Sequence, residues 1–138
     1  MRMSSARPDH AKLRVLIVDD DAMSRDYLRT VLRALHCAEI TDATNGASAT
    51  QALARSHAEL VFLDIDLAGG NGIDLIAPIL AEQPNAFIVM LSAHSTLDNI
   101  KASTAQGARG FIVKPFTAAK IQQVLANAAS HFAKLGKR

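Results

Sequence analysis

The chain has 138 residues, of which 49% are hydrophobic and 20% are charged, proportions that are typical of a single globular domain and exclude a disordered chain. No apolar run is long enough to span a membrane, and the first residues lack the apolar centre of a signal peptide. The formal net charge of +2 is too small to predict a nucleic-acid-binding protein, and the single cysteine excludes an internal disulfide, so a reducing cytoplasm is the expected location.

In chain order, the sequence predicts a flexible N-terminal tail over residues 1–12, one domain over residues 13–135 and a short C-terminal tail over residues 136–138. Within the domain, apolar runs alternate with stretches whose apolar residues recur at helical spacing. The expected strands are 13–18, 38–41, 60–63, 87–91 and 110–113. The expected helices are 22–35, a helix that begins near residue 46, 72–82, 95–106 and 117–135.

Three of these helices carry specific expectations. Met23 falls on the apolar stripe of the first helix, and Leu97, Ile100 and Ala105 are expected to face inward from the fourth. Pro78 lies inside the third helix, where it removes one backbone hydrogen bond, and it predicts either a kink or a late helix start.

The alternation of strands and helices predicts an α/β fold. Strands that are apolar on both faces indicate a parallel sheet covered by helices on both sides. Because crossovers between parallel strands are right-handed, the carboxyl ends of all the strands lie along one edge. Ligands of open α/β sheets bind at this edge, so the residues that follow each strand are the first candidates for a functional site.

Four of the five predicted strands end in polar side chains, namely Asp19 with Asp20, Asp64, Ser92 and Lys114. Taken singly, each has an ordinary explanation as a helix cap, a turn residue or a solvated lysine. Together at one sheet edge they indicate a site. Clustered carboxylates raise each other's pKa unless a cation lies among them, and Mg²⁺ binds such oxygens together with a phosphate. The arrangement predicts phosphoryl transfer with Asp64 as the nucleophile.

The residues around these strand ends resemble the receiver domains of bacterial two-component response regulators. The matching motifs are Val18–Asp19–Asp20, Leu63–Asp64, Leu91–Ser92–Ala93 and Lys114–Pro115–Phe116, within a resemblance that covers about residues 13–133. The resemblance implies a flavodoxin-like, doubly wound five-stranded parallel sheet, (βα)5, with strand order 2-1-3-4-5.

The resemblance also implies a role for each group at the edge. Asp64 would accept a phosphoryl group from the phosphohistidine of a sensor histidine kinase or a phosphotransfer protein. Asp20, Asp64 and the backbone carbonyl of Asp66 would bind Mg²⁺, with Asp19 as a nearby acid that often acts through water. Lys114 would pair with the phosphoryl oxygens. Such a protein is a signalling switch rather than an enzyme, because it acts only on its own phosphoryl group.

A conformational switch follows from the same resemblance. Ser92 would be the switch hydroxyl, and Phe111 would turn inward when Ser92 moves to the phosphate. Pro115 would follow a cis peptide bond. The output would run through the surface of the fourth helix, the last strand and the last helix, to a downstream protein target or an output domain. Direct contact with nucleic acid or a membrane is not expected, and the protein would be a monomer or a weak dimer.

The sequence departs from the family pattern after the phosphoacceptor. Ala68 stands where a proline is usual and Gly70 where a large apolar residue is usual, so this loop is expected to be loose. Asp66 adds a carboxylate two residues after Asp64, and His94 lies two residues after Ser92. We hypothesise that the side chains of Asp66 and His94 flank the path of the attacking water and tune the lifetime of the phosphorylated state.

Alternative functions remain open from the sequence. The run Phe62–Asp66 resembles the first motif of haloacid dehalogenase phosphatases, but that family has metal-binding acids after its lysine, and no Asp or Glu follows Lys114 here. A receiver that no longer takes phosphate would have lost one of the site residues, and all are present. A flavin carrier would need a phosphate-binding loop where Asp19–Asp20–Asp21 stands. The chain could also be one receiver domain of a longer regulator.

Overall fold

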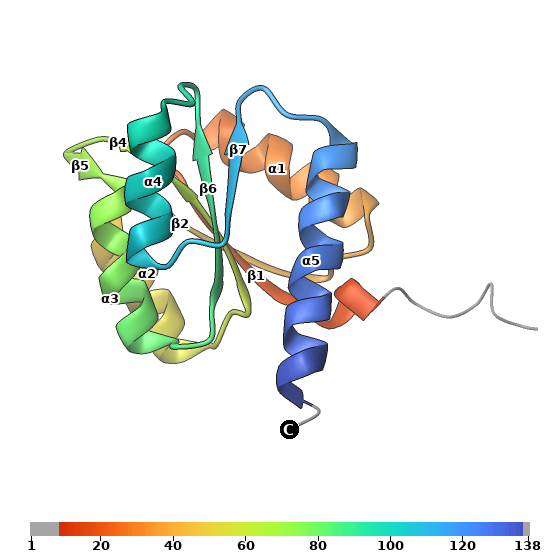
Figure 1. Cartoon of the computed structure of the whole chain (residues 1–138). Helices are drawn as coiled ribbons and strands as arrows, with labels where there is room; N and C mark the ends of the chain where they lie inside the picture. The colour runs from red at the N-terminus through yellow and green to blue at the C-terminus, as the bar shows by residue number, and fades with distance from the viewer. Residues whose placement is uncertain (1–8, 137–138) are drawn as a thin grey trace, which may run out of the picture.

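The computed structural model describes residues 9–136, which fold into a sheet layer between two layers of helices (Figure 1). The main sheet consists of β1 (Arg14–Val18), β2 (Glu39–Ala43), β3 (Leu60–Asp64), β6 (Phe87–Ser92) and β7 (Gly110–Val113). The α-helices are α1 (Ala22–Ala34), α2 (Gly46–Arg55), α3 (Ile76–Glu82), α4 (Leu97–Gln106) and α5 (Ala118–Gly136). Short elements are the 3₁₀ helices η2 (Asp9–Lys12) and η3 (Gly72–Leu75) and the two-stranded hairpin of β4 (Asp66–Leu67) and β5 (Gly70–Asn71).

All strand pairs of the main sheet are parallel, and the order is β2-β1-β3-β6-β7. Counted within this sheet alone, the order is 2-1-3-4-5, which confirms the predicted flavodoxin-like fold. β3 lies at the centre, with Val18 beside Leu63 on one side and Leu91 beside Asp64 on the other. The arrowheads of β6 and β7 point to the same upper edge in Figure 1, which is the carboxyl edge of the sheet.

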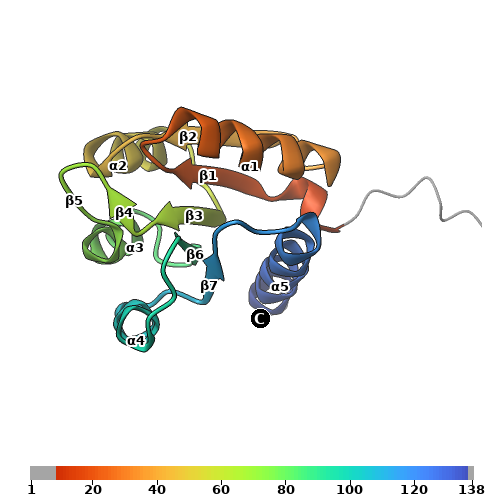
Figure 2. The ribbon, with the colours of Figure 1, turned by 90° about the horizontal axis from the view of Figure 1, so that it is seen from above.

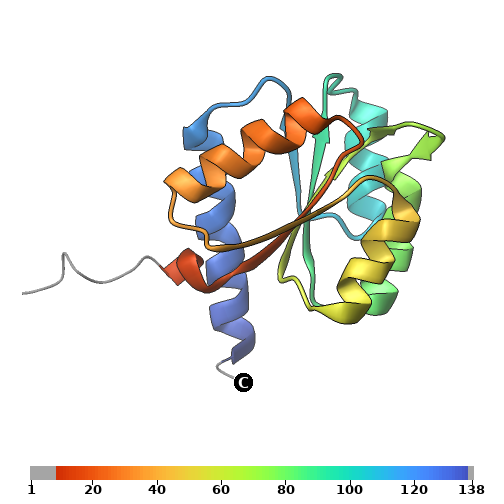
Figure 3. The same cartoon turned by 180° about the vertical axis from the view of Figure 1, so that it is seen from behind.

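Helices cover both faces of the sheet, as the apolar strands predicted. Seen from above, α1 and α5 lie on one face, and α2, α3 and α4 lie on the other (Figure 2). The view from behind shows α1 and α2 on opposite sides of β1 (Figure 3). Right-handed crossovers produce this arrangement, because the chain moves from β1 to β2 in one direction and then from β3 through β6 to β7 in the other, which reverses the face that its helices cover.

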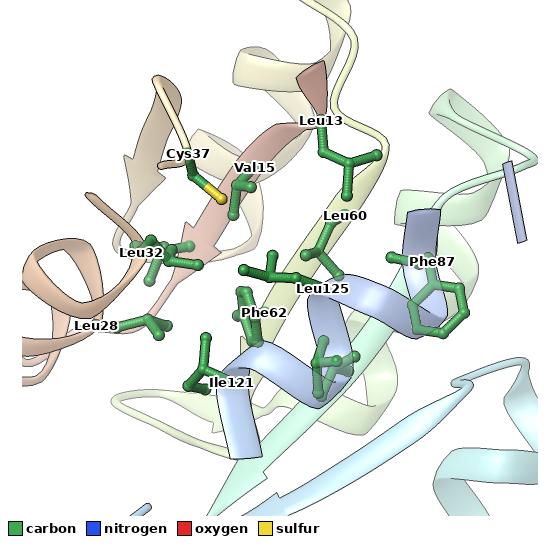
Figure 4. Packing of buried hydrophobic residues seen from close by; sticks show 14 of the residues in the cluster. Leu13, Val15, Leu28, Leu32, Cys37, Leu60, Phe62, Phe87, Ile121 and Leu125 are labelled. Carbon is green, nitrogen blue, oxygen red and sulfur yellow. The ribbon is translucent and has the colours of Figure 1, made fainter. Parts of the chain in front are cut away.

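Two apolar cores result, one on each face of the sheet. Alternate residues of β3 point in opposite directions, so Leu60 and Phe62 enter the core under α1 and α5, whereas Val61 and Leu63 enter the core under α2 and α3. Each of these side chains is fully buried, and such burial is worth about 1.5–3 kcal/mol per residue. Figure 4 shows the first core, in which Phe62 lies among residues from α1 and α5.

Side chains cap three of the helices. The side chains of Asp21, Asn45 and Thr117 accept hydrogen bonds from backbone N–H groups in the first turns of α1, α2 and α5. The α-helical part of the third helix begins late, at Ile76, after the 3₁₀ turn of η3. Pro78 therefore lies in the first turn, where a backbone N–H has no intrahelical partner, and its ring costs no hydrogen bond.

The boundary of the N-terminal tail differs from the prediction. Residues 9–12 form η2, in which Ala11 is buried and His10 Nε2 lies 2.5 Å from the carbonyl oxygen of Leu35. These contacts attach the segment to the end of α1. Residues 1–8 of the predicted tail lie outside the described residues. At the other end, α5 continues to Gly136, and residues 137–138 lie outside the described residues.

The predicted inner face of α4 is wrong. Leu97 is 64% exposed and Ile100 is 36% exposed, and Ala105 is also exposed. The residue that α4 buries is Ser103, whose hydroxyl donates to the carbonyl oxygen of Asn99 and so needs no water. Met23 of α1, also expected on an apolar stripe, is 80% exposed.

Within residues 9–136, no helix has the length and apolar character that crossing a membrane requires.

Candidate functional site

The carboxyl edge of the sheet brings together Asp19, Asp20, Asp64 and Lys114, as predicted from their positions at the strand ends. Asp64 is the last residue of β3 and is only 5% exposed. Asp19 follows β1 directly and is 1% exposed, whereas the neighbouring Asp20 is exposed. The parallel pairing of β1 with β3 places these acids side by side. Oxygens of the three carboxylates lie within 4.8 Å of one another.

This spacing fits a cation. Burial raises the pKa of Asp64 to about 6, and the negative charge of Asp19 adds to that effect, while Lys114 opposes it. Ionised Asp64 therefore lowers the stability of the folded protein, and a nearby positive charge would reduce this loss. Three carboxylates on one side, with Asp20 open to solvent, form a donor set of hard oxygens that suits Mg²⁺ and leaves room for water or phosphoryl oxygens.

Lys114 supplies the positive charge on the other side of Asp64. Its Nζ lies 3.1 Å from Oδ2 of Asp19 and 3.1 Å from Oδ2 of Asp64. Burial disfavours the ammonium, but the hydrogen bonds to the two carboxylates outweigh it, and the pKa of Lys114 is raised. Lys114 therefore stays charged. It follows β7, and its own N–H donates to the carbonyl oxygen of Ser92 at 2.8 Å, which fixes the backbone at the end of the sheet.

Backbone N–H groups orient each of the three acids. Asp19 Oδ1 accepts from the N–H of Asp21 at 2.9 Å, and Asp64 Oδ1 accepts from the N–H of Asp66 at 3.1 Å. Asp20 Oδ2 accepts from the N–H of Ala68 at 2.6 Å, a contact between segments 48 residues apart. A backbone N–H thus holds one oxygen of each acid, and Lys114 contacts the second oxygen of Asp19 and of Asp64. The role of the Asp66 carbonyl as a metal ligand stays a prediction.

The loop after Asp64, expected to be loose, forms the β4–β5 hairpin. Asp66 pairs with Asn71, and Leu67 pairs with Gly70. The turn needs Gly69, whose φ of +83° is a left-handed conformation. Behind the hairpin, a Cβ on Gly72 would lie 2.0 Å from the backbone oxygen of Asp64. A residue without a side chain is therefore required where the hairpin returns to the phosphoacceptor candidate.

Ser92 and Phe111 lie on adjacent strands, but Ser92 is not turned to Asp64. Its hydroxyl donates to the carbonyl oxygen of His94 at 2.8 Å and accepts from the N–H of His94 at 3.0 Å. Ser92 is 1% exposed, and Phe111, beside Met90 in the sheet, is half-buried against the core under α2 and α3. The predicted cis bond between Lys114 and Pro115 is present.

The side chains of Asp66 and His94 are both exposed. No hydrogen bond or ion pair joins them within residues 9–136. Their effect on the phosphorylated state, which the sequence suggested, stays a prediction.

Two residues of α1 hold the site from outside and were not predicted. Nη1 of Arg25 donates to the backbone carbonyl of Asp19 at 2.8 Å, and its Nε pairs with Asp42 of β2 at 3.2 Å. On the other side of α1, the hydroxyl of Tyr27 donates to the carbonyl oxygen of Phe116 at 3.1 Å. No periodicity or motif signals these contacts, because each joins segments that only the fold brings together.

A hollow of about 520 Å³ opens beside Lys114. Its walls are mainly apolar and include Met23, Tyr27 and Phe116, and Asp19 and Lys114 also line it. The site is therefore a charged edge bordered by an apolar surface from α1 and the β7–α5 loop.

The chain is similar to known proteins over most of its length. Residues 15–126 match the family model described as the response regulator receiver domain. The chemotaxis protein CheY of Listeria monocytogenes is 31% identical over 117 residues, which cover 85% of this chain and 98% of that protein. CheY of Thermotoga maritima is 35% identical over 112 residues, covering 81% of this chain and 93% of that protein.

Solved structures agree with this match. The receiver domain of NtrX from Brucella abortus is 32% identical, with a TM-score of 0.78 over 84% of this chain and 98% of that chain. CheY of Borrelia burgdorferi, crystallised as a CheX–CheY–BeF3–Mg complex, is 29% identical, with a TM-score of 0.77 over 83% of this chain and 87% of that chain.

Proposed function

This chain belongs to the response regulator receiver domain family of two-component systems, and from that membership we propose that it is a phosphorylation-dependent switch whose phosphoacceptor is Asp64. The observation that carries the proposal is the buried Asp64 carboxylate at the tip of the central strand, with Lys114 Nζ at 3.1 Å and two further acids beside it. The donor is a sensor histidine kinase or a phosphotransfer protein. The protein is a signalling component, as its curated relatives are.

In the proposed transfer, an oxygen of the Asp64 carboxylate forms a bond to phosphorus. The bond from phosphorus to the imidazole nitrogen of the donor's phosphohistidine breaks, and its electron pair stays with that imidazole. Lys114 is placed to pair its ammonium with an oxygen of the transferred group, because it already contacts Asp64. Burial of Asp19 and Asp64 strengthens this electrostatic contact relative to one in water.

We propose that Asp19, Asp20, Asp64 and the backbone carbonyl of Asp66 hold Mg²⁺. The support is the spacing of the three carboxylates and the raised pKa of Asp64. When bound, the ion neutralises negative charge on the phosphoryl oxygens. The exposed Asp20 leaves the site open on the side from which a phosphodonor arrives.

The proposed switch couples Ser92 to Phe111. In this structure Ser92 is bonded to the backbone of His94, so movement of its hydroxyl toward a phosphoryl group on Asp64 would break two hydrogen bonds and free space near Phe111. Phe111 lies on β7, beside Met90 of β6, and would then turn further inward. The change would be read at the surface of α4, β7 and α5.

That surface is suited to a protein partner. Leu97 of α4 and Val113 of β7 are 64% and 42% exposed. Lys101, one helical turn after Leu97, and Arg109, directly before β7, are exposed cations. The related CheY of Borrelia burgdorferi forms a complex with CheX, which supports docking of a protein on a receiver of this kind. We propose a downstream protein target or an output domain as the partner, with the receiver acting in the cytoplasm as a monomer or weak dimer, without direct contact with nucleic acid.

The decisive experiment incubates the protein with Mg²⁺ and acetyl phosphate and follows the mass gain of one phosphoryl group. We expect phosphorylation of the wild type and of Asp98→Asn, a matched change of an exposed acid on α4, but not of Asp64→Asn. Beryllofluoride should likewise change the amide spectrum near Phe111 only when Asp64 is present. Persistent phosphorylation of Asp64→Asn would overturn the assignment. Turnover of a small phosphomonoester should be negligible, whereas rapid turnover would indicate a phosphatase.

A further inference from the structure

Tyr27 is an exposed aromatic residue of α1 that reaches across to the β7–α5 loop. The side chain is 49% exposed, so core burial does not account for its placement. Its hydroxyl donates to the carbonyl oxygen of Phe116 at 3.1 Å, and the two rings lie with their centres 5.4 Å apart at an angle of 39°. Both contacts act on the same residue, which comes two positions after Lys114.

We propose that Tyr27 is a positioning residue for phosphoryl transfer, because it holds the Lys114–Phe116 segment so that Lys114 stays against Asp19 and Asp64. The proposal rests on the proposed function of Asp64 as phosphoacceptor. Tyr27 touches neither Asp64 nor Lys114 through a hydrogen bond in the described part of the chain, so it acts through the loop.

The need for such a contact follows from the geometry of Lys114. Its backbone is fixed at one point, by the hydrogen bond of its N–H to Ser92, because β7 ends at Val113. Beyond that point the segment leaves the sheet, and the four-carbon side chain must still hold Nζ at 3.1 Å from two carboxylates. A long flexible side chain loses this position readily when the backbone beside it moves.

α1 is a suitable anchor because its other side is attached to the acids. Arg25 donates to the carbonyl oxygen of Asp19 and pairs with Asp42. Arg25 and Tyr27 lie two positions apart on the helix, so they point to different sides of α1. The helix therefore connects the strand end that carries the acids to the loop that carries the lysine, and Tyr27 is the contact on the lysine side.

The apolar hollow beside Lys114 gives Tyr27 a second effect on the same group. Tyr27 and Phe116 together form part of its wall, and Lys114 and Asp19 lie at its inner side. Loosening of Phe116 would widen the hollow toward Lys114 and admit water to the ammonium. Water weakens the electrostatic contact between the ammonium and the phosphoryl oxygens, which lowers the rate of transfer.

The test uses Tyr27→Phe, which removes only the hydroxyl and keeps the ring. Its matched control is Thr30→Val, which removes a hydroxyl of the same helix that bonds only to Asp26 within α1. With acetyl phosphate and saturating Mg²⁺, we expect Tyr27→Phe to lower the rate of Asp64 phosphorylation by about threefold to tenfold, the range that one hydrogen bond covers. Thr30→Val should match the wild type. A rate for Tyr27→Phe equal to that of the control would overturn the proposal.

A double-mutant cycle separates positioning from a general structural role. In a Lys114→Met background, Tyr27→Phe should lower the rate no further, since there is no ammonium left to position. The same fold loss in both backgrounds would show that Tyr27 acts independently of Lys114, and it would overturn the proposal.

Failure of the proposed function would be recognised separately, because the wild type itself would then take no phosphate. The wild type, Tyr27→Phe, Lys114→Met and the double variant can also be compared by urea unfolding without any phosphodonor. We expect the factor by which Tyr27→Phe changes the unfolding equilibrium constant to differ by about threefold or more between the wild-type and the Lys114→Met backgrounds. Additive effects would overturn the positioning role, whatever the outcome for phosphorylation.

Discussion

At the scale of single residues, Asp64 shows a conflict between stability and function. In its proposed role as phosphoacceptor Asp64 must be ionised, yet its burial at the end of β3 disfavours the charge. Lys114 compensates only in part, because it is shared with Asp19. The free protein is therefore less stable than it would be with a neutral residue at position 64, and a cation or a phosphoryl transfer changes that balance.

This conflict predicts that Asp64→Asn stabilises the free protein at pH 8. Burial raises the pKa of Asp64 to about 6 in the folded state, above the ordinary value near 3.8 that applies when the chain is unfolded. The folded state then binds the proton more tightly, so the wild type loses stability as the pH rises from about 4 through 6. We expect Asp64→Asn to raise the free energy of unfolding by about 1–3 kcal/mol at pH 8.

The measurement is urea unfolding in EDTA at several pH values. The advantage of Asp64→Asn should shrink toward zero as the pH falls from 6 to 4, because the wild-type carboxyl is then protonated as well. A variant that is less stable than the wild type at pH 8, or an advantage that does not change with pH, would contradict the raised pKa.

Asp66 and His94 are the residues through which the sequence predicts control of the phosphorylated lifetime. Both side chains are exposed, and the prediction is that they contact a water that attacks a phosphoryl group on Asp64. We expect Asp66→Asn and His94→Ala each to slow autodephosphorylation by about twofold to tenfold, less than a fully positioned general base contributes. The rate is measured by loss of the phosphoryl mass after removal of donor, with Glu39→Gln at a distant strand start as control. Unchanged rates in both variants would remove these residues from the mechanism.

At the scale of elements, the β4–β5 hairpin is the part of the site that depends most on its glycines. The hairpin supplies the N–H groups that bond Asp20 and Asp64, so its position sets theirs. Gly72 closes it with an N–H that donates to Ile65 at 2.8 Å. Gly70 lies in the same hairpin but has free space where a Cβ would be placed.

Gly72→Ala should therefore damage the site, and Gly70→Ala should not. The added Cβ at position 72 would lie 2.0 Å from the backbone oxygen of Asp64, so the backbone of Asp64 must shift. We expect a loss of about 1–3 kcal/mol in the free energy of unfolding, as in other overpacked positions, and slower phosphorylation. Gly70→Ala should stay within about 0.5 kcal/mol of the wild type. Urea unfolding and the acetyl phosphate assay check both, and equal behaviour of the two variants would contradict the steric argument.

Elements whose sequence pattern has a single physical meaning were predicted well. β3 and β6 are buried throughout and apolar up to their last residues, so Asp64 and Ser92, which end them, had to reach the sheet edge. The α4 face could not be predicted in this way. Leu97 and Ile100 mark an apolar stripe, but periodicity does not say whether a stripe meets the core or the solvent. The buried position is Ser103, a polar residue that bonds within its own helix.

The site was predicted where residues follow strands and was missed where contacts cross between helices and loops. Asp19, Asp64 and Lys114 each come directly after an apolar run, so topology alone brings them together. The contacts of Arg25 and Tyr27 depend on the rotation of α1 over the sheet, which is set by packing of the core. The β4–β5 hairpin was also missed, because two-residue strands show no alternation of apolar and polar residues.

At the scale of the whole molecule, the grouping of the acids and the lysine at the carboxyl edge of the sheet depends on the folding of the entire domain. The sheet joins β1, β3 and β7, which carry the acids and the lysine, between two apolar cores. The three carboxylates come together only in the folded chain, so a metal that binds them binds the native state and not the unfolded one. Such selective binding stabilises the whole domain by mass action, even though the ion touches only one edge.

Mg²⁺ should therefore raise the unfolding free energy of the wild type, by an amount that grows with the logarithm of the ratio of the Mg²⁺ concentration to its dissociation constant. At a concentration 100 times the dissociation constant, the gain is about 2.7 kcal/mol, and EDTA should reverse it. Asp20→Asn should lose most of the gain, because Asp20 is the exposed member of the carboxylate cluster. Glu82→Gln, which removes an exposed acid at the end of α3, should keep it. The measurement is urea unfolding at constant ionic strength, with and without Mg²⁺. If Asp20→Asn and Glu82→Gln respond to Mg²⁺ equally, the stabilisation is a general salt effect, and the acids at the sheet edge are not its site.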